Sequence, residues 1–151
     1  MKKYFILLIM LIPATVQVFS QYNFAAKKII YFNDLQNLNL NADDTNYLDA
    51  LVQYLKANPK FLVNINGYTD NKGTHEENVK RSEEFTKQIS LFIESKDITK
   101  ERIFINPKGE SNPLTTSALP EEKAKNNRVE IFVIHTNSDD IEKVKKNFKE
   151  E

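Results

Sequence analysis

The chain has 151 residues, of which 28% are charged and 40% are hydrophobic, and this composition is typical of one soluble globular domain. Its 21 basic and 21 acidic residues give no net charge, which argues against nucleic acid as the main partner. The lack of cysteine excludes a disulfide framework, a Cys-ligated metal site and a thiol nucleophile. We also expect that the protein is not a bacterial lipoprotein, because the lipid of that class needs a Cys at the cleavage point.

The first 20 residues have the pattern of a secretory signal peptide. Two lysines precede the apolar run 4–12, and small residues follow up to Ser20. Val18 and Ser20 suit the positions before a cleavage site, so we expect cleavage before Gln21. The alternative is an uncleaved membrane anchor, but spanning a bilayer takes about 20 apolar residues. We therefore expect no transmembrane segment after cleavage.

The first half of the mature chain predicts strand, helix and strand. Residues 27–32 are rich in β-forming side chains. A helix should begin at Asn41, with two aspartates in its first turn, and end before Pro59. Residues 61–68 then alternate as a strand does. The helix has an apolar stripe at helical spacing, formed by Leu48, Leu51, Val52 and Leu55.

The second half predicts a long helix, two strands and a short helix. Thr74 and Glu77 form a capping box, so a helix should run from about His75 to Lys96. Asp97 follows it and tolerates a left-handed backbone better than most residues. The remaining elements are a strand over 103–105, a short helix over 120–125 that begins at a proline, and a largely buried strand over 128–136.

The element order β-α-β-α-β-(α)-β predicts an α/β (α+β) two-layer sandwich with helices on one face of a mixed sheet. We expect one domain over 21–137 and a charged amphipathic tail over 138–151. The tail has a thin apolar stripe, which would dock either on the domain itself or on a partner; its members are Ile141, Val144 and Phe148.

Asp70 is the strongest candidate for a ligand-binding residue. It follows a strand and precedes the positive end of a helix, which should keep it ionised. An ionised carboxylate can hold an ammonium group, and a cation beside it could hold a carboxylate, so together they would select an amino-acid-like zwitterion. The alternative is that Asp70 only caps its turn.

Several separated motifs resemble the C-terminal domain of outer-membrane protein A and of peptidoglycan-associated lipoprotein, the OmpA-like family that includes MotB-type domains. The resemblance covers about residues 27–135. It is carried by Gly67-Tyr68-Thr69-Asp70, Gly73, Asn78 and Ser82, by Gly109-Glu110-Ser111-Asn112-Pro113, and by Lys125-Asn126-Asn127-Arg128-Val129-Glu130-Ile131.

The resemblance implies non-covalent binding of peptidoglycan through the diaminopimelate of its stem peptide, with no cofactor and no metal. The family's Asp maps onto Asp70, and Thr69 and Asn78 would shape the turn and the helix start. The family's Arg, fifteen residues after that Asp, maps onto Phe85. This is a departure, since a phenylalanine cannot donate hydrogen bonds to a carboxylate.

Arg81 offers a compensation for the missing arginine. Positions 81 and 85 are one helical turn apart, about 5.4 Å along the axis and about 40° around it. We hypothesise that Arg81 holds the ligand carboxylate, with Phe85 packed under the ligand or in the core; otherwise the site is degenerate and Arg81 is a surface charge. Arg128 is a second candidate cation, or else it orients its strand.

We therefore predict a non-enzymatic periplasmic protein of a Gram-negative bacterium that binds peptidoglycan. An enzyme is disfavoured, because the chain has two histidines and no recognisable catalytic pattern. The alternative is an OmpA-like fold that serves as a protein-interaction module, using the Asn-rich loop 36–41 or the tail 138–151 to contact another envelope protein. An Asp70 salt bridge that leaves no room for a ligand would favour the alternative.

Overall fold

A computed structural model describes residues 28–32 and 40–135. The predicted signal peptide, 1–20, and the charged tail, 138–151, lie outside the described residues. The domain boundaries that we expect at both ends therefore remain predictions.

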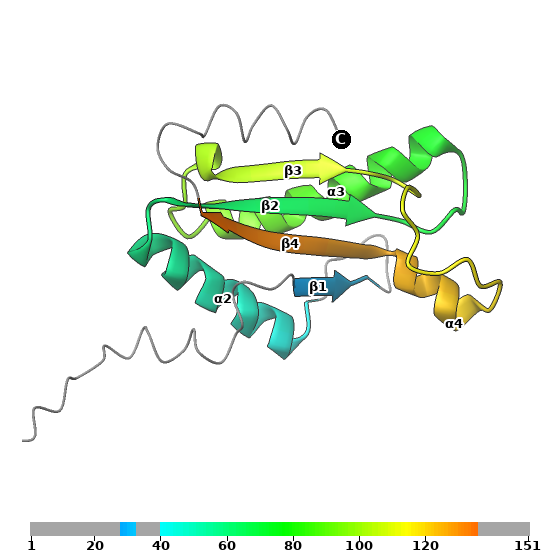
Figure 1. Ribbon diagram of the computed structural model, residues 1–151, viewed down its shortest axis with the longest axis horizontal. Coiled ribbons are helices and arrows are strands. Elements are labelled where there is room, and N and C mark those ends of the chain that lie inside the picture. Colours follow the sequence, from blue (N-terminus) through cyan, green and yellow to red (C-terminus); the bar gives the residue numbers. More distant parts are fainter. Residues whose placement is uncertain (1–27, 33–39, 136–151) are drawn as a thin grey trace, which may run out of the picture.

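Four strands form one mixed sheet. They are β1 (Lys28–Tyr31), β2 (Phe61–Tyr68), β3 (Ile103–Pro107) and β4 (Arg128–His135). Their order across the sheet is β1-β4-β2-β3, so the last strand in the chain lies between the first two (Figure 1). β4 is antiparallel to both β1 and β2, whereas β3 is parallel to β2. The two central strands, β2 and β4, are also the longest in the described residues.

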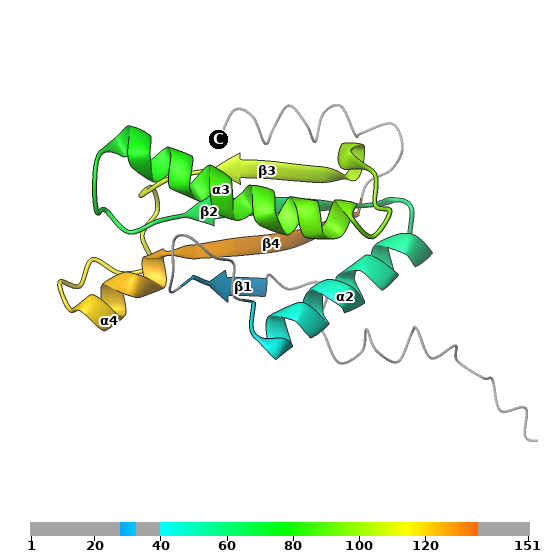
Figure 2. The same cartoon turned by 180° about the vertical axis from the view of Figure 1, so that it is seen from behind.

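Three α-helices accompany this sheet in the described residues. They are α2 (Ala42–Ala57), α3 (His75–Glu94) and α4 (Pro120–Lys123), and short 3₁₀ turns occupy Lys100–Arg102 and Ala124–Asn126. Figure 2 shows α3 crossing the sheet over β2 and β3, with α2 beside it and α4 at the end of the sheet. This arrangement confirms the predicted α+β fold, a mixed sheet with its main helices on one face.

Both long helices begin where their capping residues predict. The Asn41 side chain accepts a hydrogen bond of 2.8 Å from the backbone N–H of Asp44. At α3, the Thr74 hydroxyl accepts from the Glu77 N–H, and the Glu77 carboxylate accepts from the Thr74 N–H at 2.7 Å. These contacts satisfy backbone donors that the first helical turn leaves without partners.

The core lies between the sheet and the helices α2 and α3. The predicted stripe of α2 is fully enclosed, because none of its four residues exposes more than 2% of its surface. Val63 and Ile65 of β2 face the same core. Gly67 lets α3 approach β2 closely, since a Cβ at this position would lie 2.5 Å from the carbonyl oxygen of Ser82.

Some element boundaries differ from those predicted. α3 ends at Glu94, two residues early, and the backbone turns through Asp97, whose φ of 65° is left-handed as expected. β3 continues to Pro107, because β2 supplies a parallel partner along this whole length. In the segments that the structure describes, no helix combines the length and the apolar character needed to cross a membrane.

Candidate functional site

Asp70 is held in its turn from both sides. Its backbone N–H donates to the Asn127 side-chain oxygen at 2.9 Å, and the Asn127 amide donates back to Asp70 Oδ2 at 3.4 Å. The other carboxylate oxygen, Oδ1, accepts from the Lys72 N–H at 3.1 Å. The preceding residue is anchored as well, because the Thr69 N–H donates to the Gly109 carbonyl at 2.8 Å. The Asp70 carboxylate is therefore placed by two separate loops.

The structure brings Arg81 to Asp70. Their closest atoms, Arg81 Nη2 and Asp70 Oδ1, are 3.9 Å apart, and the two side chains are 19% and 15% exposed. The same Nη2 donates to the Lys72 carbonyl and to the Asn78 side-chain oxygen. A charge-assisted hydrogen bond has a length of about 2.7–2.9 Å, so Arg81 and Asp70 attract each other without closing into a tight pair.

Phe85 lies in the hydrophobic core, which is one of the two positions considered for it. Only 2% of its surface is exposed, and its ring stacks on Phe32 with centroids 4.3 Å apart and planes 9° apart. A side chain enclosed in this way cannot contact a ligand at Asp70. The apolar residue at position 85 therefore contributes to packing, and Arg81 is the cation that α3 presents to the turn.

Arg128 does not join Asp70, although we considered it a second cation for the ligand. It is 3% exposed, its Nε donates to Glu130 at 2.7 Å, and its guanidinium lies 3.9 Å from the centre of the Tyr68 ring. A further donor, Nη2, reaches the Asn112 carbonyl at 3.1 Å. Its hydrogen bonds therefore go to the protein, and its charge is balanced by Glu130, so its role here is structural.

A hollow of about 540 Å³ adjoins the turn that carries Asp70. Thr69 and Asn71 line one side, and Glu110 and Lys123 contribute a carboxylate and an ammonium group. The Thr69 hydroxyl and Glu110 Oε2 are buried and have no hydrogen-bond partner among the described residues. Since an unpaired buried polar atom costs free energy, this hollow suits a ligand that supplies hydrogen bonds.

The sequence reasoning missed three residues at this site: Glu110, Lys123 and Asn127. Glu110 and Asn127 stand inside motifs that we recognised, but the motifs do not show which way a side chain points. His75 Nδ1 lies 2.9 Å from Glu110 Oε1, and this hydrogen bond is the main reason that the pKa of Glu110 is below its ordinary value. Glu110 is therefore a second carboxylate at the hollow beside the Asp70 turn.

Asn78 is the remaining predicted residue, and it connects the site to α3. It is 1% exposed, and its side chain accepts from Arg81, so it fixes the direction of the guanidinium. The resulting cluster joins carboxylates and cations within one turn-and-helix region, and this arrangement can hold a zwitterion. Within the described residues, no group of three or more His, Asp or Glu side chains is placed to bind a metal ion.

Comparison with known proteins agrees with this fold. A sequence profile of the OmpA family matches residues 31–128. The peptidoglycan-binding protein ArfA of Mycobacterium tuberculosis is 37% identical over 90 residues, which are 60% of this chain and 28% of ArfA. The probable lipoprotein YiaD of Escherichia coli is 32% identical over 98 residues, covering 65% of this chain and 45% of YiaD. The matches thus span less than two thirds of these relatives.

Solved structures show the same fold at lower sequence identity. The peptidoglycan-associated lipoprotein from Burkholderia pseudomallei has a TM-score of 0.65 at 20% identity and covers 71% of this chain and 90% of its own. The C-terminal domain of Helicobacter pylori MotB has a TM-score of 0.56 at 21% identity, with coverages of 82% and 95%. The domains of this family are structural modules and not enzymes, in agreement with the non-enzymatic prediction. The chain belongs to the OmpA family.

Proposed function

We propose that this protein binds peptidoglycan non-covalently through the diaminopimelate of the stem peptide. Asp70 takes the ammonium group, and Arg81 takes a carboxylate. The observation that carries the proposal is the approach of Arg81 to within 3.9 Å of Asp70, on a turn that adjoins the hollow of about 540 Å³. Relatives whose names describe peptidoglycan binding or association, ArfA and peptidoglycan-associated lipoprotein, support the same ligand.

Room for a ligand favours this proposal over a pure interaction module. Thr69 and Asn71, on either side of Asp70, line one hollow. Lys72 and Arg81 line another, of about 400 Å³. The side chains of Asp70 and Arg81 are mostly shielded from water, so their charges are less screened than those of exposed side chains. A ligand can therefore approach the pair from either hollow.

Binding should be weaker than at a site with a dedicated arginine. The family's arginine is replaced by the buried Phe85, and Arg81 shares its Nη2 with the Lys72 carbonyl and with Asn78. A guanidinium binds a carboxylate best when two of its N–H groups are available together. Arg81 must give up some protein contacts to present such a pair.

The proposed location is the periplasm of a Gram-negative bacterium, reached through the cleavable signal peptide 1–20. The relatives include an outer membrane protein and lipoproteins, which are proteins of the cell envelope. The domain 21–137 would bind the cell wall, and the tail 138–151 would contact another envelope protein.

The test is co-sedimentation of the mature protein, 21–151, with purified sacculi of the diaminopimelate type. We expect wild type to bind, Asp70→Ala to lose binding, and Arg81→Ala to weaken it by about tenfold or more, since a hydrogen bond to a charged group contributes about 1.5–3 kcal/mol. Lys87→Ala is the matched control, because it removes an exposed charge of the same sign from the same helix.

Three results would contradict all or part of the proposal. If the wild type does not sediment with sacculi at moderate salt, the protein is an interaction module. If Asp70→Ala sediments like the wild type, the ligand lies elsewhere. If Arg81→Ala alone has no effect, Asp70 binds the ligand without the compensation that we assign to Arg81.

A further inference from the structure

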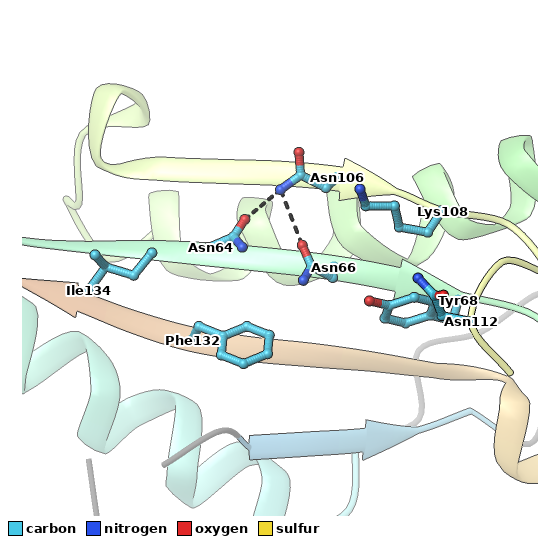
Figure 3. A pocket seen from close by; sticks show the side chains of 8 residues that line it. All are labelled: Asn64, Asn66, Tyr68, Asn106, Lys108, Asn112, Phe132 and Ile134. Carbon is cyan, nitrogen blue, oxygen red and sulfur yellow. Dashed lines mark hydrogen bonds between the residues drawn. The ribbon is translucent and has the colours of Figure 1, made fainter. Parts of the chain in front are cut away.

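The face of the sheet opposite α2 and α3, which we call the second face, changes character along its strands. Where β2 begins and β4 ends, this face is apolar. Further along β2 it becomes polar, and the Asn106 amide donates to Asn64 at 2.5 Å and to Asn66 at 3.1 Å (Figure 3). The apolar end is formed by side chains that share this face by strand register: Leu62, Phe104, Phe132 and Ile134.

The first half of β2 is shielded from water on both faces. Residues 62–65 are four consecutive buried residues, and none of them exposes more than 2% of its surface. A strand of a sheet with one wet face instead alternates buried and exposed positions. Val63 and Ile65 belong to the core beneath α2 and α3, whereas Leu62 and Asn64 point to the second face. Their burial indicates that the second face is covered at its apolar end as well.

The charged tail 138–151 starts at this end of the sheet. β4 ends at His135, which is the register partner of Phe61, the neighbour of Leu62. Only two residues separate His135 from the tail. The other segments outside the described residues precede or follow β1, and β4 lies between β1 and β2. The tail is therefore the segment whose origin lies nearest to Leu62.

The apolar stripe of the tail matches the apolar end of the second face in length. Ile141, Val144 and Phe148 have the spacing i, i+3, i+7, which places them on one side of a helix. At 1.5 Å per residue, a helix rises about 10 Å from the first to the last of them. At about 3.3 Å per residue, β2 rises about 13 Å from Leu62 to Asn66. The stripe is thus long enough to cover the apolar residues and to end near the asparagines.

The charges of the tail suit a helix with one buried side. Acidic residues stand at its start and lysines toward its end, as the helix dipole favours. An amphipathic helix buries its apolar stripe and keeps its charged side in water. That charged side remains available to the envelope protein proposed above as a partner of the tail. Its members, opposite the stripe, are Asp139, Lys143, Lys146 and Glu150.

We propose that residues 138–151 form a helix that docks on the second face, with its apolar stripe over Leu62 and Ile134. Tethering favours the tail over a second copy of the chain, because a short linker raises the effective concentration of a tethered segment to about the mM range. The docked helix gives the domain a third layer, on the side that α2 and α3 leave uncovered. It does not depend on ligand binding at Asp70, whose turn follows the opposite end of β2.

The test is NMR spectroscopy of the mature protein, 21–151, with labelled methyl groups of Ile, Leu and Val. We expect nuclear Overhauser effects between the methyl groups of the tail and those of Leu62 and Ile134, since these effects arise only between atoms in near contact. Phe148→Ser removes the last apolar residue of the stripe. It should shift the Leu62 and Ile134 methyl signals and weaken the Overhauser effects.

Lys146→Ser is the matched control, because it changes the charged side of the same tail and should leave these signals in place. Circular dichroism checks that both variants keep the fold of the domain. The measurement uses no sacculi, so its outcome is independent of the function proposed for Asp70.

Three results would overturn the proposal. The first is the absence of Overhauser effects between the tail and the sheet. The second is that the tail contacts α2 or α3 instead of Leu62 and Ile134. The third comes from a sample that mixes labelled and unlabelled protein: Overhauser effects between the two kinds of chain would mean that a second copy occupies this face.

Discussion

The two faces of the sheet are made from alternate residues of the same strands, yet their chemistry differs. On the face toward α2 and α3, Val63, Ile65, Val129 and Ile131 are completely buried. On the opposite face, the neighbouring positions of β2 carry Asn64 and Asn66. The helices cover one face, so its residues are selected by packing. Leu62 and Asn64 of β2 are also buried on the other face, where the asparagines line a polar pocket.

A similar contrast exists within α3. Arg81 and Phe85 are one turn apart, but Arg81 reaches the Asp70 carboxylate and Phe85 stacks on Phe32. A rotation of about 40° around the helix axis separates the rim of the site from the core. An arginine and an apolar residue can therefore exchange these two positions while the same helix still presents a cation to the Asp70 turn and a ring to the core.

The largest loss of stability should come from a substitution of Phe85, which lies on the helix-covered side of the sheet. Phe85→Ala removes a fully buried ring and its stacking contact with Phe32, and we expect a loss of about 3–5 kcal/mol in the free energy of unfolding. Urea denaturation followed by circular dichroism measures it. Leu91→Ala, on the exposed side of the same helix at 52% exposure, should change stability by less than about 0.5 kcal/mol. Equal losses in the two variants would contradict the assignment of Phe85 to the core.

The next largest loss of stability should come from Gly67→Ala, because α3 approaches β2 closely at this position. A Cβ in Gly67→Ala would meet the Ser82 carbonyl at 2.5 Å and Thr86 Cγ2 at 2.7 Å, and overpacking of this kind costs about 1–3 kcal/mol. Thr86→Ser in the same chain removes only the second contact, so thermal melting should show a partial rescue. A complete rescue would mean that the α3 backbone does not limit the approach.

The smallest effect concerns the pH dependence of the α3 capping box. The hydrogen bond from the Thr74 N–H holds the pKa of Glu77 below its ordinary value of 4.5. A lowered pKa in the folded state stabilises the fold above pH 4.5, and this stabilisation is lost as the pH falls through the lower folded value. Glu77→Gln should therefore melt at a lower temperature than wild type at pH 7, with a smaller difference at pH 3. A difference in melting temperature that grows toward pH 3 would contradict the stabilising role assigned to the Glu77 carboxylate.

Much of the fold follows from local sequence patterns. The apolar stripe of α2, the N-cap at Asn41, the capping box of α3 and the alternation of β2 each depend on residues a few positions apart, and the structure confirms them. The left-handed backbone at Asp97 is a conformation that aspartate tolerates better than most residues, as expected at this position. The predicted ends of the helices and strands were less accurate, because the end of a helix or strand depends on neighbours that local patterns do not include.

The candidate site was only partly predictable. Asp70 and Arg81 came from spacing along the chain and one helical turn, and the structure places them together. Arg128 was a plausible cation by position, but whether a strand residue faces the site or the far side depends on the register with β2. Glu110 and Asn127 reach the site across 35 and 57 residues of sequence, so no local pattern indicates them.

The sequence by itself determined the elements, the turn that carries Asp70 and the OmpA family, because these depend on short-range spacing and on motifs in a fixed order. Only the tertiary structure decided that Phe85 stacks on Phe32 in the core, that Arg128 lies over the Tyr68 ring and that three asparagines meet on one face of the sheet. The reason is physical: each of these outcomes is a contact between segments far apart in the chain. The order and register of the strands fix such contacts, and a helical or strand period does not contain that information.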